Sequence, residues 1–184
     1  MELIPTRLDG PLLIEPRVFP DNRGFFAETF RSNVFADFGI TEPMVQQNHS
    51  RSSYGAVRGM HFHIGDGVSK LVRCVRGEIL DVLVDIRRSS PTFGQWEAYP
   101  LDGEALRILY APIGFAHGFC VLSELADVIY QQSAYYSTDV ERGFSPSDPE
   151  VAIDWPIPLA DRLLSDRDRD APTLADVAGT FDFT

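Results

Sequence analysis

Hydrophobic residues along this chain occur in short runs that are separated by glycine, proline and other turn-forming residues. This spacing is typical of many short strands. The clearest strand is expected at residues 78–87, EILDVLVDIR, where alternation places Val82, Val84 and Ile86 on one buried face. Leu83 breaks the strict alternation, so we expect this strand to be covered on both faces.

Similar runs predict eight more strands and one short helix. The strands are expected at residues 12–19, 25–30, 56–62, 70–75, 93–101, 106–111, 118–122 and 127–133. The helix is expected at residues 32–38, where Ser32 can cap its N-terminus and Gly39 can end it in a left-handed conformation. Many short strands joined by Gly and Pro turns favour an all-β sandwich or barrel.

The last part of the chain differs in character from the strand region. Residues 154–156, Asp-Trp-Pro, are expected to close the β region, and an acidic, proline-containing tail follows them. We therefore expect a single domain over residues 1–184, in which the barrel covers about residues 11–156 and the tail, residues 157–184, wraps it.

Composition narrows the class of protein. The 184 residues are 44% hydrophobic, enough for one sizeable core. No apolar run approaches the roughly 20 residues of a membrane span, and the N-terminus lacks the order of a signal peptide. Cys74 and Cys120 lie in apolar runs, so we expect buried free thiols and a cytoplasmic protein.

The net charge of −11 argues against nucleic-acid binding, which depends on Lys and Arg to neutralise phosphates. A local basic cluster can still hold one small anionic ligand against the global charge. Arg58, Lys70, Arg73 and Arg76 lie close enough in sequence to form such a cluster, although a solvated strand face accounts for some of them.

Three of the four histidines form a recognisable pattern. His61 and His63 are two residues apart, so both point to one face of a strand, and His117 lies in PIGFAHG. These segments resemble the two motifs of the cupin barrels. Metal-binding cupins carry a Glu shortly after His-x-His, whereas residues 64–68 here contain none. We therefore expect no metal, and keep a metal-dependent oxygenase or isomerase using the three histidines as the main rival.

A closer resemblance covers nearly the whole chain. Five blocks carry it, at residues 14–30 (IEPRVFPDNRGFFAETF), 45–62 (VQQNHSRSSYGAVRGMHF), 70–96 (KLVRCVRGEILDVLVDIRRSSPTFGQW), 112–123 (PIGFAHGFCVLS) and 163–172 (LLSDRDRDAP). In their order and spacing they resemble the dTDP-4-dehydrorhamnose 3,5-epimerase family, a branch of the cupins. The resemblance implies a cupin-type jelly-roll barrel and a cofactor-free epimerase that inverts carbon 3, carbon 5 or both of a dTDP-linked 4-keto-6-deoxyhexose.

The resemblance also implies roles for individual residues. His61 is the expected general base, oriented by Asp168 or, failing that, Asp166. Tyr130 is the expected acid on the opposite face of the sugar, and Lys70 stabilises the enolate oxygen. The residues expected to contact the substrate are Arg23, Glu28, Gln46, Asn48, Arg58, His117 and Tyr136. Family members are homodimers in which N-terminal strands cross between subunits, so we expect a homodimer.

The proposed chemistry requires these residue types. A proton next to a ketone is removed by a neutral base only if a cation stabilises the developing enolate, which Lys70 can do. Histidine titrates near neutral pH, and a carboxylate on its far nitrogen fixes the tautomer. A tyrosine stays protonated at pH 7 and can return the proton. Each of these residues taken alone has an ordinary structural explanation. Only their occurrence together supports the catalytic interpretation.

The strand around His61 carries two features of its own. Arg58 and His61 are three residues apart, so a regular strand would direct their side chains to opposite faces. Both reach the pocket only if an irregularity at Gly59, such as a β-bulge, turns the strand. His63 stands where the family commonly has Gln. This change beside the sugar leaves open a mono-functional 3- or 5-epimerase and strengthens the metal alternative. A third possibility is a cupin that only binds a sugar nucleotide.

Overall fold

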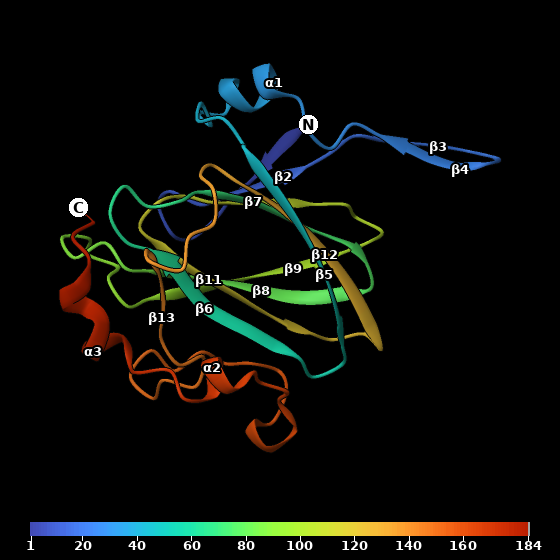
Figure 1. Ribbon diagram of the computed structural model, residues 1–184. Coiled ribbons are helices and arrows are strands. Elements are labelled where there is room, and N and C mark those ends of the chain that lie inside the picture. Colours follow the sequence, from blue (N-terminus) through green and yellow to red (C-terminus); the bar gives the residue numbers. More distant parts are fainter. Residues whose placement is uncertain (184) are drawn as a thin grey trace.

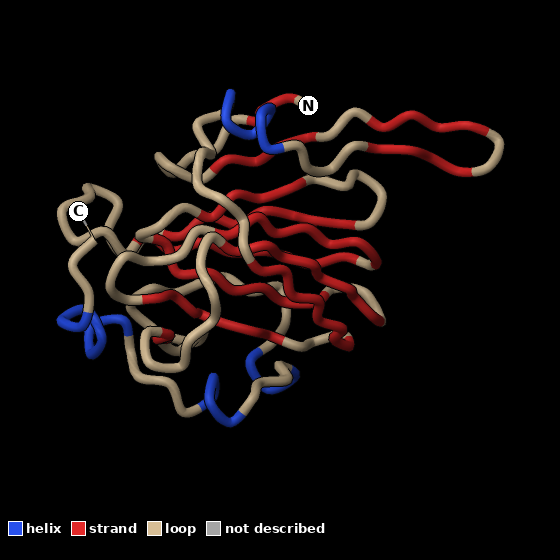
Figure 2. The backbone as a smooth tube through the Cα atoms, turned by 45° about the horizontal axis from the view of Figure 1, so that its top comes forward, coloured by secondary structure: helices blue, strands red, loops and turns tan. Residues whose placement is uncertain are grey.

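The computed structural model describes residues 1–183 and consists mainly of strands, so the predicted all-β class is confirmed (Figure 1). A six-stranded sheet has the order β1-β2-β10-β7-β12-β5, and a five-stranded sheet has the order β13-β6-β11-β8-β9. All pairings within them are antiparallel. The two sheets face each other as a jelly-roll sandwich (Figure 2).

The elements follow one another along the chain with short connections. The strands are β1 (Glu2–Ile4), β2 (Leu12–Glu15), β3 (Val18–Asp21), β4 (Gly24–Ala27), β5 (Gln46–Ser53), β6 (Val57–His63), β7 (Lys70–Arg76), β8 (Glu78–Asp85), β9 (Trp96–Asp102), β10 (Ile108–Ala111), β11 (Phe115–Val121), β12 (Leu125–Gln132) and β13 (Glu141–Gly143). The helices are α1 (Ser32–Asp37), α2 (Asp166–Arg169) and α3 (Leu174–Val177), with 3-10 turns η1 (Leu159–Asp161) and η2 (Ala178–Thr180).

Strand β8 is the central element of the core. Val82 and Val84 pack with Ile86 into a cluster that includes Trp155 and other apolar residues after β13, whereas Leu83 joins a second cluster between the two sheets. Val82, Leu83, Val84 and Ile86 are all fully buried, which confirms both the expected core residues and the expected coverage on two faces. The C-terminal segment therefore covers the outer face of the five-stranded sheet.

Several boundaries differ from those expected. Strand β5 was not predicted, because its sequence QQNHSRSS has no apolar residue and only its burial alternates. The run expected at residues 12–19 is divided into β2 and β3, and the last strand, β13, ends at Gly143 well before residues 154–156. Helix α1 does form and Gly39 has the expected left-handed φ of 92°, but Arg31, not Ser32, is its N-cap and makes no side-chain cap.

The β3–β4 hairpin is the one pair of strands, among those that the structure describes, that joins neither sheet. It projects away from the body of the molecule (Figure 1). Phe19, Phe25 and Phe26 on this hairpin are all strongly exposed. An apolar arm without a covering layer is typical of a surface that binds another chain.

Two smaller expectations concern cysteines and membranes. Cys74 and Cys120 are buried and unpaired, as expected. Within residues 1–183, no helix has both the length and the apolar character that crossing a bilayer requires.

Candidate active site

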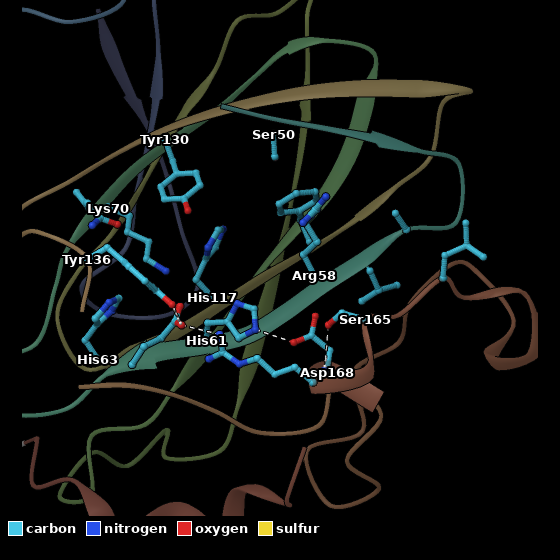
Figure 3. Close-up of a pocket in the computed structure, with 17 residues that line it drawn as sticks. Ser50, Arg58, His61, His63, Lys70, His117, Tyr130, Tyr136, Ser165 and Asp168 are labelled. Atoms are coloured by element: carbon cyan, nitrogen blue, oxygen red, sulfur yellow. Dashed lines mark hydrogen bonds and ion pairs between the residues drawn. The ribbon is translucent and has the colours of Figure 1, made fainter. Parts of the chain in front are cut away.

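A cavity of about 430 Å³ lies between the two sheets and is closed on one side by the C-terminal segment (Figure 3). Its lining consists of Ser50, Ala56, Val57, Arg58, His61, His63, Lys70, His117, Phe119, Tyr130, Gln132, Tyr136, Glu141, Leu163, Ser165, Arg167 and Asp168. The residues expected to do the chemistry thus surround one space. Polar and charged side chains reach this space from both sheets, so it offers hydrogen-bonding partners for the hydroxyl groups of a sugar.

His61 and Asp168 form a hydrogen-bonded pair across 107 residues of sequence. The Nε2–H of His61 donates to Oδ1 of Asp168 over 2.7 Å, and Asp168 is buried. Ser165 caps α2 by accepting the backbone N–H of Asp168 at 3.1 Å, which holds the carboxylate in place. Because Nε2 is committed to Asp168, Nδ1 of His61 is the nitrogen that can accept a proton.

The surroundings of Asp168 stabilise its ionised form. Burial acts to raise the pKa of this carboxyl, but hydrogen bonds from His61 and Ser165 and the proximity of His61 outweigh it, so the pKa is lowered. Asp168 therefore stays ionised at neutral pH. Asp166 has a side chain that is 90% exposed and pairs with Arg169 at 2.7 Å, so it does not contact His61.

The expected irregularity in β6 is present. His61 pairs with His117 and Arg58 pairs with Phe119, so β6 carries one more residue than β11 over this stretch. Gly59 has a φ of 133°, and a Cβ there would lie 2.5 Å from the Cα of Gly118. Only glycine fits this bulge. The prediction that Arg58 and His61 both reach the pocket is confirmed.

Tyr130 lies on the wall opposite His61 (Figure 3). It comes from β12, in the other sheet. Burial raises the pKa of Tyr130, and a hydrogen bond with Asn48 opposes this effect without reversing it. The phenol is therefore protonated at pH 7, as a proton donor must be.

Lys70 is the first residue of β7, next to β12, and its Nζ lies 5.9 Å from the ring centre of Tyr130. It is buried, and burial lowers its pKa to about 8, although Glu141 and Asp81 act in the opposite direction. A lysine with this pKa is still mostly charged at pH 7, in surroundings where a charge acts strongly.

His117 forms a second buried histidine–carboxyl pair. Its Nε2 lies 3.0 Å from Asp81 of β8, and both side chains are buried. Burial raises the pKa of Asp81, and the nearby His117 and Lys70 only partly offset this. His117 thus lines the pocket in a fixed orientation, as expected of a wall residue.

Three of the expected substrate contacts are linked to one another at one side of the pocket. Asn48 pairs with Tyr130 across the β5–β12 ladder, and its Oδ1 accepts Nε2–H of Gln46 at 3.1 Å. Oε1 of Gln46 accepts the backbone N–H of Tyr136 at 2.9 Å. Only Tyr136 of these three lines the cavity itself.

The structure does not bring Arg23 and Glu28 to the pocket of their own chain. Arg23 lies at the turn of the β3–β4 hairpin and binds Asp21 at 2.6 Å. Glu28 follows β4 and lies 3.4 Å from Arg31. Both belong to the projecting arm, which extends away from the pocket of its own chain (Figure 1).

Sequence reasoning missed an ion pair in the lining of the pocket. Arg167 donates to Oε2 of Glu141 at 2.6 Å, and the hydroxyl of Tyr136 donates to the same oxygen at 3.0 Å. Burial acts to raise the pKa of Glu141, but Arg167 and its other partners lower it overall. Arg167 stood within the tail block that resembled the family, but no pattern marked Glu141 as its partner.

The three histidines do not form a metal centre in the described chain, where no group of three or more His, Cys, Asp and Glu residues is arranged to hold an ion. His61 and His117 are each committed to a carboxyl group. The donor set that the metal-dependent alternative requires is therefore not assembled.

Comparison with known proteins shows the family to which the chain belongs. A sequence model of the dTDP-4-dehydrorhamnose 3,5-epimerase family matches residues 5–176. The chain belongs to the dTDP-4-dehydrorhamnose 3,5-epimerase family. The resemblance expected from the five sequence blocks is thereby confirmed, and so is the assignment to an epimerase family.

Individual family members are similar along almost their whole length. The dTDP-4-dehydrorhamnose 3,5-epimerase of Shigella flexneri is 48% identical over 91% of this chain and 93% of its own. A crystal structure of the dTDP-6-deoxy-D-glucose-3,5-epimerase RmlC of Legionella pneumophila, in complex with dTDP-4-keto-L-rhamnose, matches with a TM-score of 0.95 and 42% identity over 100% of this chain and 98% of that one. The dTDP-4-dehydrorhamnose 3-epimerase of Streptomyces niveus is 42% identical over 96% of this chain and 85% of its own. The family thus includes relatives named for carbon 3 alone.

Proposed function

We propose that this protein epimerises a dTDP-linked 4-keto-6-deoxyhexose at carbon 3, carbon 5 or both, in deoxysugar biosynthesis of the dTDP-rhamnose type. One observation carries the proposal. A histidine oriented by a buried carboxylate faces a protonated tyrosine across a cavity that also contains a buried lysine. This arrangement suits removal of a proton from one face of the sugar and its return on the other.

In the proposed mechanism, Nδ1 of His61 takes the proton from the carbon next to the ketone, and Asp168 stabilises the imidazolium that results. Lys70 stabilises the enolate oxygen as charge develops on it. Tyr130 then donates its proton from the opposite face. We assign binding of the diphosphate to Arg58, which lies at the side of the cavity away from Lys70 (Figure 3).

The test is incubation of the protein with the dTDP-linked 4-keto sugar in deuterated water containing a chelator. Each inverted carbon takes up deuterium, so magnetic resonance of the product reports carbon 3 and carbon 5 separately. We expect exchange to persist in the chelator. Exchange that is lost with the chelator and restored by zinc or iron would favour the metal-dependent alternative, and dTDP binding without exchange would favour a sugar-nucleotide binding protein.

The rate should depend on the charge of Lys70. Because burial lowers the pKa of Lys70 to about 8, kcat/KM is expected to fall as pH rises through about 8 and the lysine loses its proton. Tyr130, whose pKa is raised, keeps its proton over this range. The measurement is the pH profile of deuterium uptake between pH 6 and 10. A profile that stays flat up to pH 10 would contradict the assigned role of Lys70.

We also propose that the protein is a cytoplasmic homodimer in which the β3–β4 hairpin of one chain reaches the pocket of the other. The exposed Phe25 and Phe26 on the hairpin, and the distance of Arg23 and Glu28 from their own pocket, support this. Each chain would be a single domain, residues 1–184, because Asp168 in the C-terminal tail completes the site on the barrel.

Light scattering at micromolar concentration should give the mass of a dimer. Mixing chains that carry His61→Asn with chains that carry Arg23→Ala should then restore activity, since one kind of pocket in the mixed dimer has both native residues. A monomer at this concentration, or no recovery on mixing, would contradict the proposed exchange of hairpins.

A further inference from the structure

His63, the last residue of β6, has a feature that the proposed mechanism does not use. Only 3% of the residue is exposed, and its ring lies edge-on to Tyr136, with 6.4 Å between the ring centres. It lines the same cavity as His61. Neither Nδ1 nor Nε2 of His63 has a hydrogen-bonding partner among the residues that the structure describes.

A buried polar side chain without partners is costly, since it has lost its bonds to water and gained none in exchange. Proteins usually avoid this cost or pair the group. A side chain in this state that also lines a cavity is explained when the ligand supplies the missing partner. His63 therefore points to a contact with the substrate.

The charge state of His63 limits what this partner can be. Burial and, to a smaller extent, the charge of Lys70 lower the pKa of His63 to about 4, and Glu141 opposes this only in part. The ring is therefore neutral at pH 7, with one N–H donor and one acceptor nitrogen. A sugar hydroxyl, which both donates and accepts, matches this pair, whereas a keto oxygen and a phosphate accept only.

The position of His63 selects one hydroxyl. His63 and Lys70 lie together at one end of the cavity, Arg58 lies toward the other, and His61 and Tyr130 lie between them (Figure 3). This step rests on the proposed function, in which Lys70 binds the oxygen on carbon 4. The neighbours of that carbon carry a hydroxyl on carbon 3 and a methyl group on carbon 5.

We propose that His63 binds the hydroxyl on carbon 3 of the sugar and is a specificity-determining residue for substrates that carry it. The glutamine common at this position in the family also has one donor group and one acceptor group, so it can make the same contact. Leucine has a similar size and can make neither bond.

The experiment compares two substrates and three proteins. The substrates are the dTDP-linked 4-keto-6-deoxyhexose and its 3-deoxy analogue, and the proteins are the unaltered chain, His63→Leu and His63→Gln. The measured quantity is kcat/KM for deuterium uptake at the carbons next to the ketone, which both sugars possess. His49→Leu serves as a matched control, because His49 is exposed on β5 and lies outside the cavity.

We expect the unaltered chain to prefer the 3-hydroxy sugar by roughly ten- to a hundredfold. His63→Leu should lose this preference, His63→Gln should keep most of it, and His49→Leu should keep all of it. The same preference in His63→Leu as in the unaltered chain would overturn the assignment of His63 alone. No exchange of either sugar by the unaltered chain would instead overturn the proposed function, and this inference with it.

Thermal unfolding of the ligand-free protein supplies a second readout. His63→Leu removes the unpartnered polar group, so its melting temperature should rise, by about 2–4 °C for each kcal/mol gained in a protein of this size. Binding of dTDP, measured by calorimetry, should stay unchanged and show that the variant is folded. A lower melting temperature would mean that His63 serves packing, and would overturn the proposal.

Discussion

Replacing His61 by asparagine should reduce proton exchange at the sugar by about 10²–10⁴-fold. The reason is that Nδ1 of His61 is the ring nitrogen left free by the bond from Nε2 to Asp168, and an asparagine side chain has no comparable base. Binding of dTDP should change little, because the proposed function assigns the nucleotide and diphosphate to residues other than His61. Deuterium uptake and calorimetric titration with dTDP separate the two effects.

Two further histidine variants test whether His61 or His63 is the base. His63→Gln should remain active, because it keeps a donor and an acceptor in the same place. His49→Asn makes the same change as His61→Asn at an exposed histidine on β5 and should have no effect on exchange. An inactive His63→Gln combined with an active His61→Asn would show that the base is His63.

Replacing Asp168 by asparagine should also lower the exchange rate by about 10²–10⁴-fold, with little change in dTDP binding. The amide carries no charge to stabilise the imidazolium, and its NH₂ group can force the His61 ring into the other tautomer. The cap of α2 should survive, because Ser165 accepts the backbone N–H of residue 168, which the substitution leaves in place. A loss of rate therefore reports on the histidine and not on the helix.

Asp166→Asn is the matched control for Asp168→Asn. It makes the same chemical change two residues away on the same short helix, but the Asp166 side chain is exposed and pairs with Arg169 at the surface. Such a surface pair contributes little, so rate and stability should remain close to those of the unaltered chain. Equal losses in both variants would indicate that the tail needs its negative charge in general and not a bond to His61.

Local pattern was sufficient for much of the fold. The alternation in residues 78–87 predicted β8, and the break at Leu83 predicted that both faces of this strand are covered, which the two core clusters confirm. The odd spacing between Arg58 and His61, which would place them on opposite faces of a regular strand, predicted the bulge at Gly59. These predictions succeed because a strand has a period of two, so the sequence alone states which side chains share a face.

Prediction from hydrophobic pattern failed for strands that are held by backbone hydrogen bonds to a neighbouring strand and not by apolar side chains. Strand β5 is polar throughout its length, yet it makes an eight-residue ladder with β12. Strand β13 has only three residues and depends on its pairing with β6. Backbone hydrogen bonds to a neighbouring strand leave no signature in composition, so no local pattern could reveal either of them.

The sequence by itself determined the family, the strands of the core and the residue types that the chemistry needs. Only the tertiary structure decided which of them meet: Asp168 and not Asp166 at His61, Glu141 at Arg167, and the hairpin with Arg23 away from its own pocket. It also showed that the ring nitrogens of His63 are buried and find no partner within residues 1–183. These contacts join residues far apart in sequence, and their geometry depends on how the tail and the two sheets pack, which no local periodicity encodes.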